Sequence, residues 1–342
     1  MVDVVLFNGK PISKPGLYIS SEADYHADRL CPTPSLSRSI GQKLLDESAR
    51  HAWTAHPRLN TAPKKEEKQE KRAEIGSAAH AILLSQPTKI EMIDAPTYQT
   101  NAAKAARIAA HKTGAIPLLK EDYALLMDMM NVAKRELSIH EDERIRALVT
   151  GELIGEYHNE ITACWQDVVG GHWCRARIDR LVIEPTRITV IDYKTTEMSA
   201  APDAVQKTIY NNEYELQDGF YRRGLRHLFP QIDKHEIALD FLFIVQEQKA
   251  PHEITVAKLD IPGRQIGEKK ASAAVRMWDH HVTTNEWPGY PSKTKTAEMP
   301  PYTETRWLAR EIEDERLQNL PSDPLNPFEE VPYRPKPIAL PC

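Results

Sequence analysis

Two stretches decide the fold of this chain: Cys174-Arg-Ala-Arg-Ile-Asp-Arg-Leu181 and Ile188-Thr-Val-Ile-Asp-Tyr-Lys-Thr-Thr196. Both are rich in β-branched and apolar residues, so they predict strands over His172–Ile183 and Arg187–Thr195. Glu184-Pro185-Thr186 lies between them and is typical of a tight turn. The two strands are therefore expected to form an antiparallel hairpin.

The pattern extends outward from this hairpin on both sides. Glu160–Gln166 predicts a preceding strand, linked through a turn at Gly170-Gly171, so three consecutive strands should form a meander. Further strands are expected near Gly16–Ser20, Ile237–Gln246 and Ile254–Leu259. The sheet is therefore expected to extend well beyond the hairpin.

Helical periodicity and composition account for most of the remainder. Helices are expected from the Ser35 region to Trp53, over Ile75–Leu84, within Asn101–Leu148, over Val205–Phe229, and over Arg264–Thr284. Strands flanked by helices predict an α/β (α+β) fold with a mixed central sheet and a mostly helical N-terminal part. Proline becomes dense after Trp287, which indicates an extended tail with one helix over Glu304–Leu317.

Bulk properties exclude several classes of protein. The chain has 342 residues, 41% hydrophobic and 27% charged, enough for an ordinary core. It shows no apolar run of membrane-helix length and no signal pattern, so a cytoplasmic location without membrane contact is expected. The 4 cysteines form no C-x-x-C pair, which argues against a zinc knuckle. The net charge of -5 leaves nucleic-acid binding open.

The chemistry is expected at Asp192 and Lys194. Alternation along a strand places both on the face of Ile188 and Val190, where buried charges need partners. Asp179 on the preceding strand would add a second carboxylate. Converging carboxylates suit Mg²⁺, which activates water and neutralises a phosphodiester, while Lys194 would lie beside that water. A structural salt bridge is the alternative for Asp-x-Lys in a strand.

Further segments resemble the PD-(D/E)xK nuclease superfamily, in its RecB-like and RecE-type (exodeoxyribonuclease VIII-like) branch. That branch has a G-x-x-x-H helix before the sheet, which Gly76-Ser-Ala-Ala-His80 matches. It also has Q-x-x-x-Y on the helix after the catalytic strand, which Gln217-Asp-Gly-Phe-Tyr221 matches. The opening Ser35-Leu-Ser-Arg-Ser-Ile and closing Glu286-Trp-Pro-Gly-Tyr290 are similar too. Ile178 stands where the family pattern has proline.

The resemblance implies a restriction-endonuclease-like fold and a role for each matched residue. The implied metal ligands are His80, Asp179, Asp192 and the Tyr193 backbone carbonyl. Catalysis would use Lys194, Asp179, Asp192, Glu160, Gln217 and Tyr221, with Glu160 holding a second metal or its water. DNA would be contacted by Arg175, Arg177, Gln217 and Tyr221.

Several of these residues have a structural alternative. His80 could be a core or surface imidazole, Tyr221 a core side chain and Glu160 an exposed strand residue. Arg175 and Arg177 could instead pair with the carboxylates.

The resemblance also implies an activity and an organisation. It implies a Mg²⁺-dependent exodeoxyribonuclease, with Mn²⁺ as a substitute, that degrades duplex ends 5′ to 3′ and leaves 3′ tails for phage recombination. A structure-specific or single-strand nuclease and a non-catalytic DNA-end-binding module are the alternatives. Expected segments are an N-terminal extension (1–34), the nuclease domain (35–290) and a proline-rich extension (291–342). A homo-oligomer and a single-strand annealing or single-strand-binding protein are the expected partners.

Overall fold

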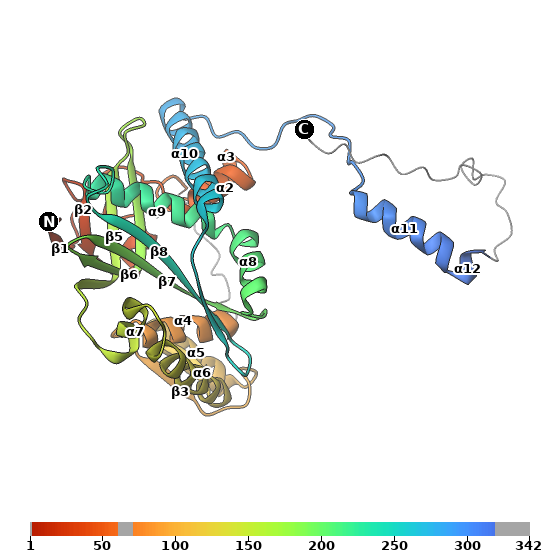
Figure 1. The fold of residues 1–342 in the computed structure, drawn as a ribbon, viewed down its shortest axis with the longest axis horizontal. Helices are drawn as coiled ribbons and strands as arrows, with labels where there is room; N and C mark the ends of the chain where they lie inside the picture. Colours follow the sequence, from red (N-terminus) through yellow and green to blue (C-terminus); the bar gives the residue numbers. More distant parts are fainter. Residues whose placement is uncertain (1, 61–70, 319–342) are drawn as a thin grey trace. The chain divides into compact units, whose positions relative to one another are not determined.

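The computed structural model describes residues 2–60 and 71–318, with the side chains of 71, 72 and 318 left out (Figure 1). The chain divides into two units, Met1–Tyr290 and Pro291–Cys342, and each is described by itself. None of the described helices is long and apolar enough to cross a membrane.

A seven-stranded mixed sheet forms the centre of the first unit, in the order β1-β2-β5-β6-β7-β8-β9. The β5-β6-β7 meander is antiparallel as predicted, whereas β7 pairs with β8 in parallel. A second, two-stranded sheet of β3 and β4 was not predicted. The strands are β1 (Val4–Leu6), β2 (Gly16–Ile19), β3 (Ile90–Ile93), β4 (Ile116–Leu119), β5 (Glu156–Gln166), β6 (Trp173–Glu184), β7 (Arg187–Thr196), β8 (Ala238–Glu247) and β9 (Ile254–Ala257).

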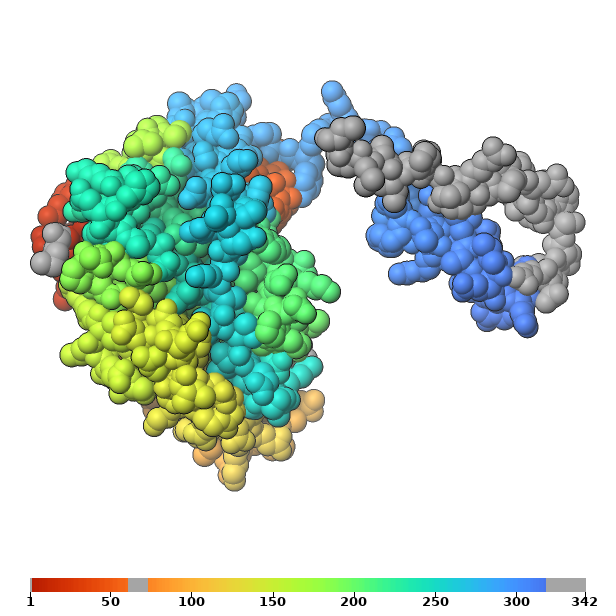
Figure 2. Space-filling view, viewed as in Figure 1, coloured from red at the N-terminus to blue at the C-terminus, as the bar shows by residue number. Residues whose placement is uncertain are grey.

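Helices cover both faces of the large sheet. On one face α4, α6 and α7 form a core with Ile191, Tyr193 and Ile244, and on the other α2, α9 and α10 pack on Ile188, Val190 and Phe243. In the space-filling view the yellow atoms of α6 and α7 lie beside the teal atoms of the β8–β9 region (Figure 2). The predicted mixed sheet flanked by helices is therefore confirmed. The helices of this unit are α1 (Glu22–His26), α2 (Arg38–Asp46), α3 (Ala49–Ala55), α4 (Lys71–Leu83), α5 (Asn101–Lys112), α6 (Lys120–Ser138), α7 (Glu143–Thr150), α8 (Pro202–Asn211), α9 (Tyr214–Leu228) and α10 (Ile261–Thr284).

Two predicted long helices are each broken in two. The break between α2 and α3 lies at Ser48, whose hydroxyl caps the new helix by accepting from His51 N at 3.3 Å. The break between α8 and α9 lies at Glu213, which has a left-handed φ of 53° that no helix interior can adopt. Periodicity alone continues across both points, so the sequence pattern did not separate the halves.

Glycines let α9 and α10 approach each other closely. A Cβ at Gly219 would overlap the backbone of Gly267, and a Cβ at Gly267 would overlap the carbonyl of Glu215. The backbone contact is possible only without side chains at these two positions. It fixes α9, which carries Gln217 and Tyr221, against a long helix.

The first 34 residues are built into this unit. β2 pairs with β5, and Leu17 and Leu30 are fully buried. Asp28 is also fully buried and accepts hydrogen bonds from the Ser35 backbone N–H (2.9 Å) and hydroxyl (2.5 Å). Its carboxylate pairs with Arg175 at 3.0 Å, which ties the segment to β6.

The second unit contains α11 (Pro301–Glu313) and α12 (Glu315–Gln318), where one helix over Glu304–Leu317 was expected. None of the residues of α11 is buried. The extended tail expected beyond Leu320 lies outside the described residues.

Candidate functional site

The large sheet divides at the candidate site. β6 and β7 pair only from Arg187–Ile191 with Arg180–Glu184. The part of β6 that precedes Arg180 stays paired with β5, whereas the part of β7 that follows Ile191 stays paired with β8. If the β5–β6 and β6–β7 pairings are each extended by one residue, Glu160 lies opposite Asp179, and Asp179 lies opposite Asp192. The three acids therefore form one row across three strands. The backbone N–H of Tyr193 donates to Asp179 Oδ2 at 3.0 Å, so an acidic side chain takes the place of a strand partner.

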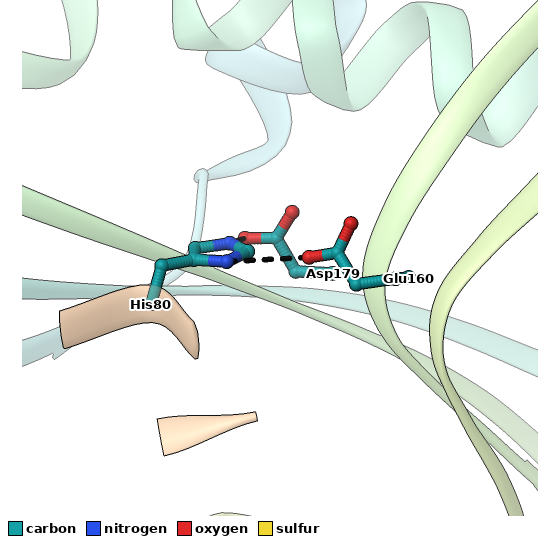
Figure 3. Close-up of side chains that lie close together, drawn as sticks. All are labelled: His80, Glu160 and Asp179. Carbon is teal, nitrogen blue, oxygen red and sulfur yellow. Dashed lines mark ion pairs between the residues drawn. The ribbon is translucent and has the colours of Figure 1, made fainter. Parts of the chain in front are cut away.

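His80 reaches this row from α4. Its Nε2 lies 2.8 Å from Asp179 Oδ2 and its Nδ1 lies 3.2 Å from Glu160 Oε1, so the ring lies between the two carboxylates (Figure 3). Close packing explains why glycine suits the first position of G-x-x-x-H. A Cβ at Gly76 would lie only 2.9 Å from Thr195 Oγ1 on β7. The close approach of α4 to β7 thereby positions the histidine.

Asp192 and Lys194 form a buried ion pair on the neighbouring strand. Lys194 Nζ lies 2.7 Å from Asp192 Oδ2, without the angles of a hydrogen bond, and Gln217 Nε2 donates to Asp192 Oδ1 at 2.6 Å. The Asp192 side chain is 1% exposed, and the Lys194 side chain 24%. Lys194 Nζ also lies 5.1 Å from the centre of the Tyr214 ring. Asp192 is thus held in place by Lys194 and Gln217.

Arg175 and Arg177, two of the three arginines of β6, have different surroundings. Arg177 pairs with Glu160, donates to the Ser20 carbonyl at 3.1 Å and lines the cavity described below. Arg175 is 3% exposed and donates to the Ser35 carbonyl at 2.6 Å. Its guanidinium has internal partners and no route to a ligand, which argues against the DNA contact expected for Arg175.

Tyr221 is a core side chain that also lines the cavity. It is 7% exposed and packs in the core, yet its hydroxyl donates to the Arg177 carbonyl at 2.8 Å and it lines the cavity. Gln217 and Tyr221 lie one turn apart on α9, as their spacing indicates, and they contact β7 and β6 respectively. The helix thereby connects the two strands where these separate.

A cavity of about 660 Å³ opens over these residues. Its lining includes His80, Glu160, Asp179 and Lys194. Glu22, Tyr25 and His26, all from α1, also line it, as do His111 and residues 114–116. Segments that lie far apart in the sequence therefore line one polar cavity.

The electrostatics of the site reflect close opposite charges. Burial alone lowers the pKa of His80, but the carboxylates of Asp179 and Glu160 outweigh burial and raise that pKa to about 9. Burial raises the pKa of Asp179, but His80 and Lys194 outweigh it and leave the pKa below its usual range. For Asp192 burial prevails over Lys194 and raises the pKa to about 6. The acids of this row thus differ in proton affinity.

The residues present fit a divalent cation. Among the described residues, His80, Glu160 and Asp179 offer ligand atoms that all lie within 4.8 Å of one another. Imidazole nitrogen and carboxylate oxygen are ordinary ligands of divalent ions, and such an ion would offset the clustered negative charge. When bound, it would lower the pKa of a water and neutralise charge on a phosphoryl group.

Gln86 is a site residue that sequence reasoning missed. Its Nε2 donates to Glu160 Oε1 at 2.8 Å and lies 3.1 Å from His80 Nδ1. It follows the end of α4, where Ser85 adopts a left-handed φ of 50°. No motif includes it, although its position six residues after His80 places it just past the predicted helix end.

One comparison with known proteins identifies the family of this chain. A sequence model of the PD-(D/E)XK nuclease superfamily matches residues 35–323. No curated protein matches the chain. A solved structure described as a "putative exonuclease" from Eubacterium rectale is 11% identical with a TM-score of 0.49, over 84% of this chain and 98% of that one. SSO0001 is 11% identical with a TM-score of 0.24, over 61% and 87%. The family match covers most of the chain and contains the whole His80, Asp179, Asp192 and Lys194 set, so the chain belongs to the PD-(D/E)XK nuclease superfamily.

Proposed function

We propose that this nuclease is an exodeoxyribonuclease of the RecE type, which hydrolyses phosphodiesters from duplex ends with Mg²⁺ in the nuclease domain of residues 35–290. The observation that carries the proposal is the contact between His80 and Asp179 in the lining of a cavity that Lys194 also lines. A cavity of about 660 Å³ has the size of a small-ligand pocket. It would therefore accept the end of one strand more readily than an intact duplex.

Each side chain has a role in this proposal. His80 and Asp179 hold the cation, with Asp192 and the Tyr193 carbonyl as the further ligands implied by the family. Lys194 orients the attacking water and stabilises negative charge on the phosphate in the transition state. Gln217 keeps Asp192 in place through its 2.6 Å hydrogen bond. Tyr221 and Arg177 line the cavity and lie where the cleaved strand would pass.

The direction of digestion and the assembly remain predictions. Hydrolysis from 5′ to 3′, a homo-oligomer that surrounds DNA, a role in phage recombination and a single-strand annealing partner all follow from the RecE resemblance. The residues 291–342 are proposed as an extension for such a partner.

Digestion of labelled DNA tests the proposal. Linear duplex labelled at either 5′ or 3′ ends, covalently closed circular duplex and single strands are incubated with Mg²⁺ and the full chain. We expect linear duplex to be degraded from its 5′ ends and the circle to survive. Cutting of the circle as fast as the linear form would refute an exonuclease, and preference for single strands would favour the single-strand alternative.

Variants connect the activity to the site. Asp179→Asn and Lys194→Met should each lose at least about 100-fold in rate, since each removes a group proposed to act on the reacting phosphate. Lys234→Met is the matched control, because Lys234 is exposed and lies outside the cavity. Activity that survives Asp179→Asn would show that another site cleaves DNA.

A further inference from the structure

The two nitrogens of His80 face two different carboxylates. Nε2 lies 2.8 Å from Asp179 Oδ2, and Nδ1 lies 3.2 Å from Glu160 Oε1. A histidine that binds a metal through one nitrogen usually donates the other N–H to a carboxylate or carbonyl, which fixes its tautomer and orientation. One of the two acids should therefore share the cation with His80, and the other should hold the ring.

The contacts of Glu160 favour the holding role. Its Oε1 accepts from Gln86 Nε2 at 2.8 Å and faces His80, while its Oε2 accepts from Arg177. Both oxygens thus already have protein donors. Asp179 lies on the other side of the ring, beside the start of the Asp192–Lys194 segment, and accepts from Tyr193 N. The cation is therefore expected on the Asp179 side.

Backbone conformation adds an independent observation. Glu160 has a φ of 53° in the middle of β5, and Ser85, directly before Gln86, has a φ of 50°. Residues other than glycine adopt this region only at an energetic cost, and such residues cluster at functional sites. Here the two left-handed residues bring Glu160 and Gln86 together on the same edge of His80. An exposed strand glutamate would need neither distortion.

We propose that Glu160 and Gln86 are positioning residues that act through His80. Glu160 accepts the Nδ1–H of His80, which leaves Nε2 free for a cation shared with Asp179. Gln86 donates to Glu160 Oε1 at 2.8 Å and also lies 3.1 Å from His80 Nδ1. Because a protonated Nδ1 cannot accept from an amide, the Gln86 N–H groups must then point to Glu160 and not to the ring. This assignment rests on the proposed metal site, and it replaces the second-metal role that the family resemblance implies for Glu160.

Binding of Mn²⁺ alone to the full chain, measured by calorimetry without DNA, tests the assignment. Glu160→Ala should weaken Mn²⁺ by about 10–100-fold, the usual loss when a partner of a ligating histidine is removed. Glu160→Gln keeps an acceptor oxygen for Nδ1–H, so its loss should be about tenfold or less. Gln86→Ala should weaken Mn²⁺ by less than Glu160→Ala. Asp179→Asn removes a ligand and should lose the most.

Three results would overturn the assignment. If Glu160→Gln loses as much affinity as Asp179→Asn, Glu160 is itself a ligand. If Glu160→Ala binds Mn²⁺ like the unaltered chain, Glu160 does not hold His80. If Asp179→Asn binds Mn²⁺ normally, the proposed metal site itself is wrong, which separates the failure of the site from the failure of this inference.

A direct reading of the tautomer complements the affinities. In ¹⁵N spectra of the Mg²⁺-bound chain, the His80 ring should carry its proton on Nδ1, and Glu160→Ala should reduce that preference. Melting curves in EDTA verify that each variant is folded. Unchanged His80 signals in a folded Glu160→Ala variant would contradict the proposal.

Discussion

Replacement of Lys194 by methionine should harm stability and catalysis for separable reasons. Methionine keeps most of the side-chain volume and removes the ammonium group that lies 2.7 Å from Asp192 Oδ2. Asp192 is 1% exposed, so its carboxylate would lose its nearest cation while it stays out of water. The predicted consequence is a protein with a lower free energy of unfolding, in which the Asp192 carboxylate takes up a proton.

The magnitude follows from the burial of the pair. Breaking a buried ion pair by removing one partner costs about 3–5 kcal/mol. We expect the lower end, about 3 kcal/mol at pH 8, because Lys194 is partly exposed and its pairing is partly screened. The pKa of Asp192 is already raised to about 6 and should rise further without the ammonium group. The cost should therefore shrink towards pH 5, where the carboxyl group is protonated in the folded state.

Denaturant unfolding in EDTA at pH 5 and pH 8 measures this effect, and the double variant Lys194→Met/Asp192→Asn is the control. Removing both charges should recover most of the stability and none of the activity. The rate should fall at least about 100-fold in both variants. If Lys194→Met is as stable as the unaltered chain at pH 8, or if the double variant is no more stable than the single one, the reasoning from the buried pair is refuted.

Three further predictions concern other parts of the fold. Burial raises the pKa of Asp167, but bonds from Arg223 at 2.6 and 2.7 Å outweigh burial and hold that pKa well below its usual range. The contribution of ionised Asp167 to folding stability is complete above the unfolded pKa of about 4 and is lost as the pH falls below that value. Asp167→Asn should therefore flatten the acid branch of a plot of melting temperature against pH. Gly219→Ala should cost about 3 kcal/mol in denaturant unfolding, at the upper end of the usual overpacking range, because a methyl group would overlap the Gly267 backbone; a variant as stable as the unaltered chain would contradict that close contact. Arg175→Met should lower the unfolding midpoint and leave the KM for DNA unchanged, since its partners are internal; a raised KM at unaltered stability would restore the DNA contact.

Local patterns predicted the strands and their acids well. The alternation that put Asp192 and Lys194 on the face of Ile188 and Val190 is local to one strand, and β7 follows it. A short turn then fixes the pairing of β6 with β7. The order of β5, β6 and β7 could therefore be inferred before any contact was known.

Other features depend on contacts between distant segments. β4 contains Pro117 and lies within a stretch of helical composition, so its pairing with β3 left no local signal. Gln86 meets Glu160 across 74 positions in the sequence. Alternation of side chains along the strand places Arg175 on the same face as Arg177. It could not show that Asp28 and Ser35 surround Arg175.

The segment that precedes the family match has a consequence for how this nuclease can be shortened. Ser20 and Tyr25 accept from Arg177 and Arg175 through their backbone carbonyls. A chain that begins at residue 35 would leave both guanidinium groups without these acceptors and would turn β5 into a bare outer strand, open to pairing with other molecules. The catalytic region recognised by sequence is thus smaller than the autonomous folding unit, and aggregation is the expected fate of the shortened chain.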